Sequence, residues 1–336
     1  MSQEATADRA WRRDIDGLRA VSIALVVCYH AFHRWMPGGL VGVDVFFVIS
    51  GYLITGIISR RLAAGDFSFA WFYSRRVRRI FPALFLVLAA VLVFGWFELL
   101  PPEYRNLGWH TAAGAGFVSN LALLQGTGYF DGAAESNPLQ HLWSLGVEEQ
   151  FYIFWPLLLW IGRRRIRPAA MAGILAVLSF VFCVTLAGHN PDAAFYLPFS
   201  RAWELMAGAV LACIPPSPQV TGRRAEYLSV AGCLLIAAAA IFGGQEAFHV
   251  WWAVPPVAGA VLVILAGPGA SINRVLLSSS PAVLAGAISY PLYLWHWPIL
   301  AFSNVLAPGG PTRAESFLGV MAALVLAWLT WRYLER

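Results

Sequence analysis

Long apolar stretches alternate with short polar connections along the whole chain. Each stretch approaches the roughly 20 apolar residues with which an α-helix crosses a bilayer. The pattern therefore predicts an all-α fold, a polytopic transmembrane helix bundle of about ten spans. The stretches lie near Leu18–Phe32, Leu40–Ile58, Ile80–Leu100, Leu142–Ile161, Ala169–Ala187, Ala202–Ile214, Leu228–Gly243, Trp251–Ala266, Ala282–Leu306 and Phe317–Leu334.

The segment Thr111–Leu124 is also apolar, but it is short and rich in glycine and alanine, which is typical of an interfacial or re-entrant helix. The distribution of arginines between the two sides of the membrane indicates whether this segment crosses the bilayer. With ten spans and a cytoplasmic amino end, the inner connections hold Arg60 to Arg79, Arg163 to Arg167, Arg223, Arg224 and Arg274, and the outer ones hold only Arg34, Arg105, Arg201 and Arg313. This asymmetry is expected of short cytoplasmic connections, so we predict ten spans with both termini in the cytoplasm.

Composition supports a membrane protein. The chain is 59% hydrophobic and 12% charged, with a mean hydropathy of +0.65. These values exclude a water-soluble globule, a disordered chain and a nucleic-acid binder with an exposed basic face. The four cysteines fall within apolar runs without paired spacing, so neither a disulfide framework nor a metal site is indicated. Residues 1–13 are polar and predict a cytoplasmic segment rather than a signal peptide, and residues 1–336 are expected to form a single transmembrane domain.

Arg19 and His30 share one face of the first predicted span. Eleven helical steps return to within roughly 20° of the starting direction, while the rise is about 16.5 Å. Arginine at the inner end can reach phosphate, and an imidazole at the bilayer centre can move protons. Alternatively, Arg19 extends to the membrane surface and His30 bonds a neighbouring helix.

A cluster of four arginines precedes the third predicted span, at Arg75, Arg76, Arg78 and Arg79. Guanidinium groups bind phosphate oxygens in two places, so the cluster suits a polyphosphate. The competing interpretation is topology control together with binding of anionic lipids.

Adjacent carboxylates lie near the start of the fourth predicted span, at Glu148 and Glu149. Burying them in a span is unfavourable unless they are paired or protonated, which points to a function. On a helix, Glu148 shares a stripe with His141 and Ser144, and Glu149 points about 100° away. Glu204 is expected instead to form an internal salt bridge with Arg201, three residues earlier.

Two further ionisable residues lie in predicted spans. Asp44 begins the second predicted span and is either a helix-start anion or a member of a site. His296 lies among tryptophans in Ser289 to Pro298, where two prolines predict a break or kink lining a cavity. An interfacial histidine in an aromatic belt is the alternative.

Five segments together resemble the membrane-bound acyltransferase-3 family, the bacterial group that O-acetylates cell-surface polysaccharides. The resemblance runs from Asp14 to the last residue. The matching segments are Asp16 to Ala20 with His30, Gly42 to Ile54, Arg75 to Pro82, Trp143 to Tyr152 and Ser289 to Pro298.

The resemblance implies transfer of an acetyl or other acyl group from cytoplasmic acetyl-CoA to a hydroxyl of a surface polysaccharide or glycolipid, such as lipopolysaccharide O-antigen, across the bacterial inner membrane. Metal and nucleic acid are not expected. The implied roles are His30 and Glu148 as catalytic residues, Arg19, Arg75, Arg76 and Arg79 as ligands of the donor phosphates, and Asp44, Ser50, Trp143, Glu149 and His296 as site support. In this interpretation Glu148 orients the imidazole or stabilises its cation.

The chain departs from larger family members, in which a further span and a periplasmic hydrolase-like domain follow the helix that ends like Arg332 to Arg336. We expect that domain to be absent from residues 1–336, which form either the membrane part of a longer protein or a stand-alone member. The rival from another class is a proton-coupled transporter or flippase, with His30, Glu148 and Glu149 as a proton relay. Labelled donor separates the two, because only a transferase yields labelled glycan.

Overall fold

The structure, a computed structural model, describes residues 11–126, 137–214, 220–243, 250–307 and 310–335. Within these ranges every regular element is a helix, which confirms the all-α fold. Residues 1–10 of the predicted cytoplasmic segment lie outside the described residues. The first half of the chain forms α1 (Arg13–Ala31), α2 (Gly42–Ala64), α3 (Phe69–Glu98), α4 (Pro101–Ala115), α5 (Ser119–Gly126), α6 (Leu142–Gly162) and α7 (Pro168–Ala187). The second half forms α8 (Pro191–Tyr196), α9 (Pro198–Cys213), α10 (Arg223–Phe242), α11 (Val250–Ala266), α12 (Ser280–Ala287), α13 (Ser289–Leu306) and α14 (Arg313–Thr330).

Five segments are long and apolar enough to cross a bilayer. They are Gly39–Ala64, Phe69–Glu98, Pro168–Ala187, Arg223–Phe242 and Arg313–Glu335. The most apolar 18 residues of the third have a mean hydropathy of 2.4, yet only 17% of them are buried by the rest of the protein. An apolar helix that the protein covers so little is stable where lipid covers the remainder.

The other predicted spans fall on α1, α6, α9, α11 and the pair α12 and α13. These helices are shorter or interrupted by polar residues, such as the two glutamates of α6. Length and composition thus support several crossings, and the count of ten stays a prediction.

Two predicted segments are each divided in the structure. Thr111–Leu124 is split between α4 and α5, with Phe117 between them at φ 55°. Ala282–Leu306 is split at Ile288 into α12 and α13. The chain therefore breaks before the motif at Ser289 to Pro298, because Pro291 falls in the first turn of α13, where a missing N–H is tolerated.

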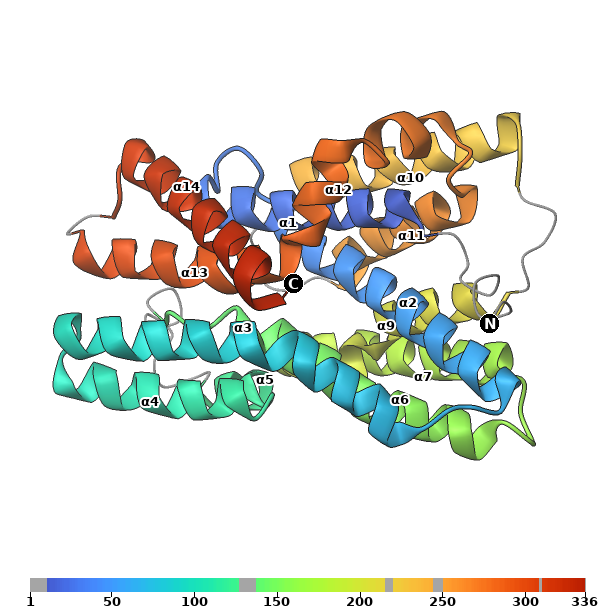
Figure 1. The fold of residues 1–336 in the computed structure, drawn as a ribbon, viewed down its shortest axis with the longest axis horizontal. Helices are drawn as coiled ribbons and strands as arrows, with labels where there is room; N and C mark the ends of the chain where they lie inside the picture. The colour runs from blue at the N-terminus through green and yellow to red at the C-terminus, as the bar shows by residue number, and fades with distance from the viewer. Residues whose placement is uncertain (1–10, 127–136, 215–219, 244–249, 308–309, 336) are drawn as a thin grey trace.

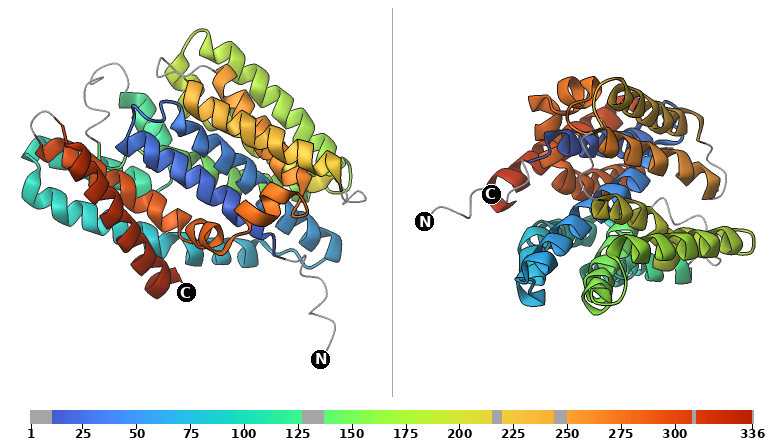
Figure 2. Two further views of the ribbon diagram at one scale, coloured as in Figure 1. Left: turned by 90° about the horizontal axis from the view of Figure 1, so that it is seen from above. Right: turned by 90° about the vertical axis from the view of Figure 1, so that its right-hand side faces the viewer.

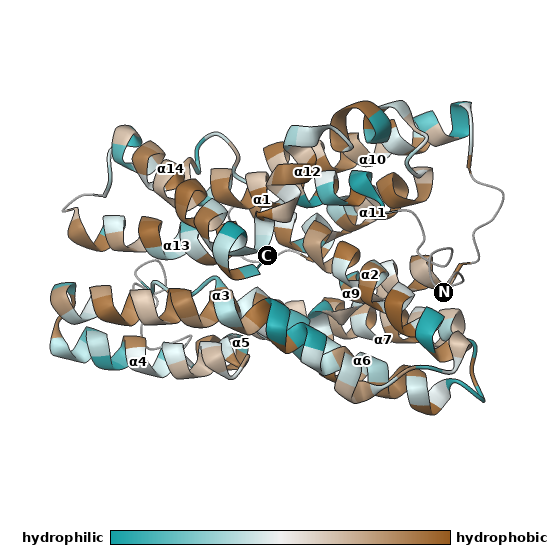
Figure 3. Cartoon of the chain, in the orientation of Figure 1, coloured by the Kyte–Doolittle hydropathy of each residue, from teal (hydrophilic) through white to brown (hydrophobic). Residues whose placement is uncertain are grey.

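The arginine cluster also differs from expectation. The sequence places these residues in a connection before a span near Ile80, whereas α3 already begins at Phe69. Ser68 caps the helix by accepting a hydrogen bond from the Trp71 backbone N–H. The arginines therefore project from a continuous helix, visible in Figure 3 as the strongly hydrophilic turns of α3.

The helices pack mainly in antiparallel neighbours. α3 and α4 lie side by side, as do α13 and α14 (Figure 1). Seen from above, α1 and α2 run through the middle, with α14 on one side and α7 and α10 on the other (Figure 2). Helices from distant parts of the chain therefore meet around α1 and α2.

Glycines bring α2 and α9 into close contact. A Cβ atom at Gly51 would lie 1.8 Å from the Leu205 carbonyl oxygen, and one at Gly208 would lie 2.0 Å from that of Val48. Only glycine allows two helix backbones to approach this closely. The contact holds α2 against the middle of α9, about two turns into α2.

Candidate active site

A cavity of about 420 Å³ opens among α1, α2, α3, α6 and the start of α13. Apolar side chains form much of its wall, and polar groups converge on it from all five helices. The polar lining residues are Arg12, Asp16, Arg19, Ser50, Arg76, Arg79, Ser144, Glu148, Glu149, Tyr152, Ser289, Tyr290 and Tyr293. Ser289 and Tyr290 follow the break at Ile288, so the predicted break does line a cavity.

Three of the four arginines expected to bind phosphate line this cavity. Arg19 enters from α1, and its guanidinium lies 3.9 Å from the Asp16 carboxylate. Arg76 and Arg79 enter from α3, one turn apart, and the Arg76 guanidinium lies 4.9 Å from the centre of the Tyr152 ring. Arg75 differs, because it lies over Trp71 and is not among the lining residues.

Both glutamates of α6 reach the cavity. Glu148 accepts hydrogen bonds from the Ser50 hydroxyl of α2 and from the Tyr152 hydroxyl one turn further along α6. Glu149 is buried, and its Oε1 has no hydrogen-bond partner among the described residues. The side chains of α6 that line the cavity therefore extend beyond the single face of the helix that the sequence predicts.

A cluster of histidines lies beside this cavity. Nδ1 of His30 is 3.0 Å from Nε2 of His296, and the two rings stack with centres 5.2 Å apart. The ring of His141, at the start of α6, lies 5.8 Å from that of His296. His296 is fully buried, so the interpretation of an interfacial histidine is wrong.

Tyr293 and Ser144 lie between the cavity and the histidines. Both line the cavity, and their hydroxyls are 2.6 Å apart. The Tyr293 hydroxyl also donates to the His141 carbonyl, and its ring lies 5.5 Å from that of His296. None of the three histidines is a lining residue, so the histidine cluster lies behind the part of the cavity wall to which Tyr293 and Ser144 belong.

The expected pairing of Glu148 with His30 is wrong as a direct contact. Within the described ranges, His30 bonds to His296 and Glu148 bonds to Ser50 and Tyr152. The reason is depth, because Glu148 faces Ser50 across the cavity whereas His30 lies in the last turn of α1.

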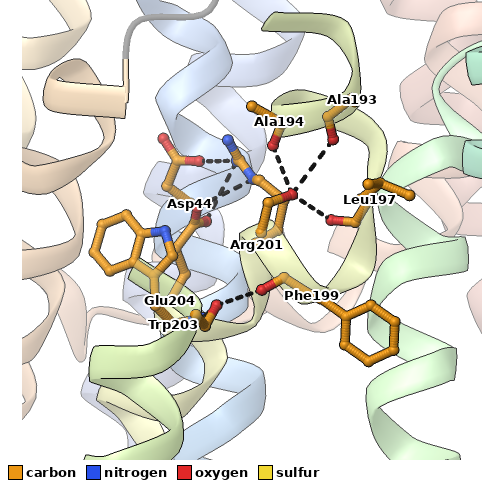
Figure 4. Close-up of polar contacts among 10 residues, drawn as sticks. Asp44, Ala193, Ala194, Leu197, Phe199, Arg201, Trp203 and Glu204 are labelled. Atoms are coloured by element: carbon orange, nitrogen blue, oxygen red, sulfur yellow. Dashed lines mark hydrogen bonds and ion pairs between the residues drawn. The ribbon is translucent and has the colours of Figure 1, made fainter. Parts of the chain in front are cut away.

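Asp44 belongs to a second, closed ionic cluster (Figure 4). Arg201 forms ion pairs with Asp44 of α2 and with Glu204, whose Oε1 lies 3.0 Å from Nε. All three side chains are at most 8% exposed. The predicted salt bridge between Arg201 and Glu204 is confirmed, and Asp44 pairs with the same guanidinium.

Trp143 packs against this second cluster. The Arg201 guanidinium lies 5.6 Å from the centre of its ring, and the Phe47 ring contacts it edge to face. Trp143 is 5% exposed and does not line the cavity. Of the five residues expected to support the site, Ser50 and Glu149 line the cavity, His296 contacts His30, and Asp44 and Trp143 contact Arg201.

Sequence reasoning did not assign roles to Tyr293, Tyr152 or His141. All three lie inside motifs whose charged groups stand out in the sequence. The Tyr293 hydroxyl contacts Ser144 across two helices that are distant in sequence, whereas the Tyr152 hydroxyl bonds Glu148 within α6. Within the described ranges, no set of three His, Cys, Asp or Glu side chains is placed to hold a metal ion.

The comparisons with known proteins agree with this arrangement. The acyltransferase domain family matches residues 12–332, nearly the whole chain. The chain belongs to the acyltransferase-3 family. The match covers nearly all of the helices that the structure describes.

Three proteins to which the chain is similar have names that describe acetyl or acyl transfer. The chain is 31% identical to the peptidoglycan O-acetyltransferase OatA of Listeria monocytogenes, over 100% of the chain and 57% of that protein. It is 29% identical to the O-acetyltransferase OatA of Staphylococcus aureus, over 96% of the chain and 56% of that protein. It is 34% identical to a protein of Komagataeibacter xylinus provisionally named membrane-bound transacylase BcsY, over 97% of the chain and 82% of that protein. The chain thus spans little more than half the length of the two OatA proteins, and no solved structure gives a significant match.

Proposed function

We propose that the protein transfers an acetyl group from acetyl-CoA, bound from the cytoplasmic side, to a hydroxyl of a cell-surface polysaccharide. The observation that carries the proposal is the convergence of Arg19, Arg76 and Arg79 on one cavity beside the histidines. Cavities of roughly 300–1,000 Å³ suit small ligands and cofactors, and this one is about 420 Å³.

The arginines would hold the phosphates of the donor. Guanidinium forks bind phosphate oxygens in pairs, and charge-assisted bonds of this kind are about twice as strong as neutral ones. Four arginines and three carboxylates line the cavity; Arg12 is paired with Asp14, and Glu148 is engaged by two hydroxyls. A polyanion would therefore find guanidinium groups that the described ion pairs do not neutralise, apart from the 3.9 Å contact of Arg19 with Asp16.

His30 would act on the thioester. As a base, the imidazole removes the proton of the acceptor hydroxyl while its oxygen bonds to the carbonyl carbon and the carbon–sulfur bond breaks. The proton then passes to the departing thiolate. As a nucleophile, the imidazole would carry the acyl group itself. Both routes require the acyl end to pass Tyr293 and Ser144, whose hydroxyls must separate.

Glu148 would support this step from the cavity wall. Its carboxylate holds the hydroxyls of Ser50 and Tyr152, so it orders the surface along which the donor extends. Glu149, with one unpartnered buried oxygen, would lie beside the same path.

The acceptor would be a sugar polymer. Two relatives carry the names peptidoglycan O-acetyltransferase and O-acetyltransferase, which favours a glycan hydroxyl. Peptidoglycan and lipopolysaccharide O-antigen both present such hydroxyls outside the membrane. The donor side must then face the cytoplasm, which agrees with ten spans, both termini inside, and a location in the bacterial cytoplasmic membrane.

The test uses membranes that contain the protein and acetyl-CoA labelled in the acetyl group. We expect labelled polysaccharide from the wild type and from His110→Ala, a histidine variant on α4 away from the cavity. His30→Ala should abolish labelling while the amount of folded protein stays unchanged. Full labelling by His30→Ala would overturn the assignment. Gradient-dependent uptake of a solute without labelled glycan would instead support the transporter.

A further inference from the structure

The contact between His30 and His296 defines which ring nitrogen carries each proton. His296 directs Nδ1 at two backbone carbonyl oxygens, those of Leu292 at 3.1 Å and Tyr293 at 2.8 Å. A carbonyl oxygen can only accept a hydrogen bond. Nδ1 of His296 must therefore carry a proton, whatever the state of the rest of the ring.

The protonation state of the second ring nitrogen of His296 follows from the burial of the ring. The ring is fully buried, and the described side chains whose rings contact it are those of His30, His141 and Tyr293. The described residues form no ion pair between a carboxylate and His296, so an imidazolium there would be a buried cation without a counter-charge. The ring is therefore neutral, and its Nε2 is a hydrogen-bond acceptor.

The proton between the two rings consequently belongs to His30. Nε2 of His296 accepts, so Nδ1 of His30 donates across the 3.0 Å contact. A neutral imidazole has one N–H, which leaves Nε2 of His30 without a proton. No hydrogen bond to that Nε2 is present among the residues that the structure describes.

We propose that His296 is a positioning residue that holds His30 in the tautomer protonated at Nδ1, so that Nε2 of His30 is the atom that acts. This inference rests on the proposed function for the identity of the reaction. His296 does not touch the reacting groups. It accepts the hydrogen bond from the imidazole of His30, and backbone carbonyl oxygens hold its own ring in place. In many histidine-dependent enzymes a carboxylate has this role.

The proposal specifies where protons go. Nε2 of His30 takes the proton of the acceptor hydroxyl as the new ester bond forms and the carbon–sulfur bond breaks. The cation that results keeps its Nδ1–H bonded to His296. The proton on Nε2 then passes to the thiolate, which restores the same tautomer and leaves His296 unchanged throughout.

A tautomer measurement tests the proposal without any activity assay. Protein labelled with ¹⁵N-histidine is reconstituted in lipid, and solid-state NMR distinguishes protonated from unprotonated ring nitrogens. The signals of the two rings are identified by their loss in His30→Gln and His296→Phe. We expect both rings to be protonated at Nδ1 alone, and His30 to redistribute between tautomers in His296→Phe. Protonation of His30 at Nε2 in the wild type would overturn the proposal.

Kinetics with labelled acetyl-CoA provide the second readout. His296→Phe keeps an aromatic ring but removes the acceptor, so we expect kcat to fall by about a hundredfold or more while KM for the donor changes little. His296→Gln offers an acceptor oxygen near the position of Nε2 and should recover at least about tenfold of that loss. Equal kcat in the Phe and Gln variants would contradict the positioning role.

His189 supplies a matched control. Its Nδ1 also contacts the carbonyl of the residue four positions earlier, Thr185, at 2.9 Å, but the ring is exposed. His189→Phe removes the same local bond and should leave kcat unchanged. If the wild type yields no acetylated product while the NMR result holds, the proposed reaction fails and the tautomer assignment stands.

Discussion

The protein holds two ionic clusters, and they differ in whether they are open. Around Arg201, one guanidinium and two carboxylates are enclosed together, each at most 8% exposed. Around Glu148, four arginines and three carboxylates face a cavity of about 420 Å³. In the first cluster both carboxylates pair with the one guanidinium. The arginines of the second cluster are open to a ligand that enters the cavity. Access through a cavity, and not the number of charged groups, therefore distinguishes a ligand site from a structural ion-pair cluster.

Removing Arg201 should have the largest effect. Arg201→Met leaves two carboxylates buried against each other, and loss of one partner of a buried ion pair destabilises by about 3–5 kcal/mol. We expect a marked fall in the thermal unfolding midpoint of the purified protein in detergent.

Arg76→Met is the matched control for this change, because it removes a guanidinium from the open cavity. It should shift the midpoint far less. The triple variant Asp44→Leu, Arg201→Met, Glu204→Leu should recover much of the lost stability, since no unpaired charge remains. Equal midpoints for Arg201→Met and Arg76→Met would remove the distinction between the clusters.

Arginine substitutions in the open cluster should act on the donor instead of on stability. Arg76→Met or Arg79→Met each removes a charge-assisted contact of about 1.5–3 kcal/mol, which corresponds to roughly a 10- to 100-fold weaker Kd for coenzyme A. Titration calorimetry in detergent measures this. Arg75→Met provides the comparison within α3, because Arg75 lies over Trp71 and outside the cavity lining. An equal loss in Arg75→Met would show that the donor binds along the outside of α3.

Glu148→Gln tests the carboxylate of the open cluster. The change keeps an acceptor for one hydroxyl but weakens the bonds from Ser50 and Tyr152, so we expect kcat to fall by about tenfold. The unfolding midpoint should change by only a few degrees, because the cavity admits water to this side chain. Glu98→Gln, at the exposed end of α3, serves as the control. A loss of folded protein in Glu148→Gln would assign this residue a structural role like that of Glu204.

Salt concentration should have the smallest effect, and the two ionic clusters should respond to it differently. Raising ionic strength from about 0.05 M to about 0.5 M shortens the screening length severalfold, so the affinity for coenzyme A should fall by several-fold. The unfolding midpoint should respond weakly, because buried pairs are screened little. A donor affinity independent of salt would argue against binding through phosphates.

Local patterns in the sequence predicted what lies within one helix. The three-residue spacing of Arg201 and Glu204 forecast their ion pair, and the apolar runs forecast most helices within a few residues. The arginine cluster was assigned to a connection because charge usually marks a loop. The helix instead begins directly after its cap, Ser68, and continues through the arginines into the apolar part of α3.

Contacts between distant helices could not be predicted in the same way. His30 and His296 are 266 residues apart, and Asp44 and Arg201 are 157 apart. Periodicity says which face a residue occupies but not which helix meets that face. The sequence therefore supplied the members of both clusters, while their assignment to an open and a closed group required the fold.

The glycine contact between α2 and α9 has a consequence for motion. With Gly51 against Leu205 and Gly208 against Val48, neither helix can slide or rotate past the other without a clash between backbones. The two behave as one rigid unit, and Ser50 and Asp44 are fixed to it. An opening that lets an acyl chain past Tyr293 would then come from displacement of α13 or α6, which carry Tyr293 and Ser144, against a stationary frame.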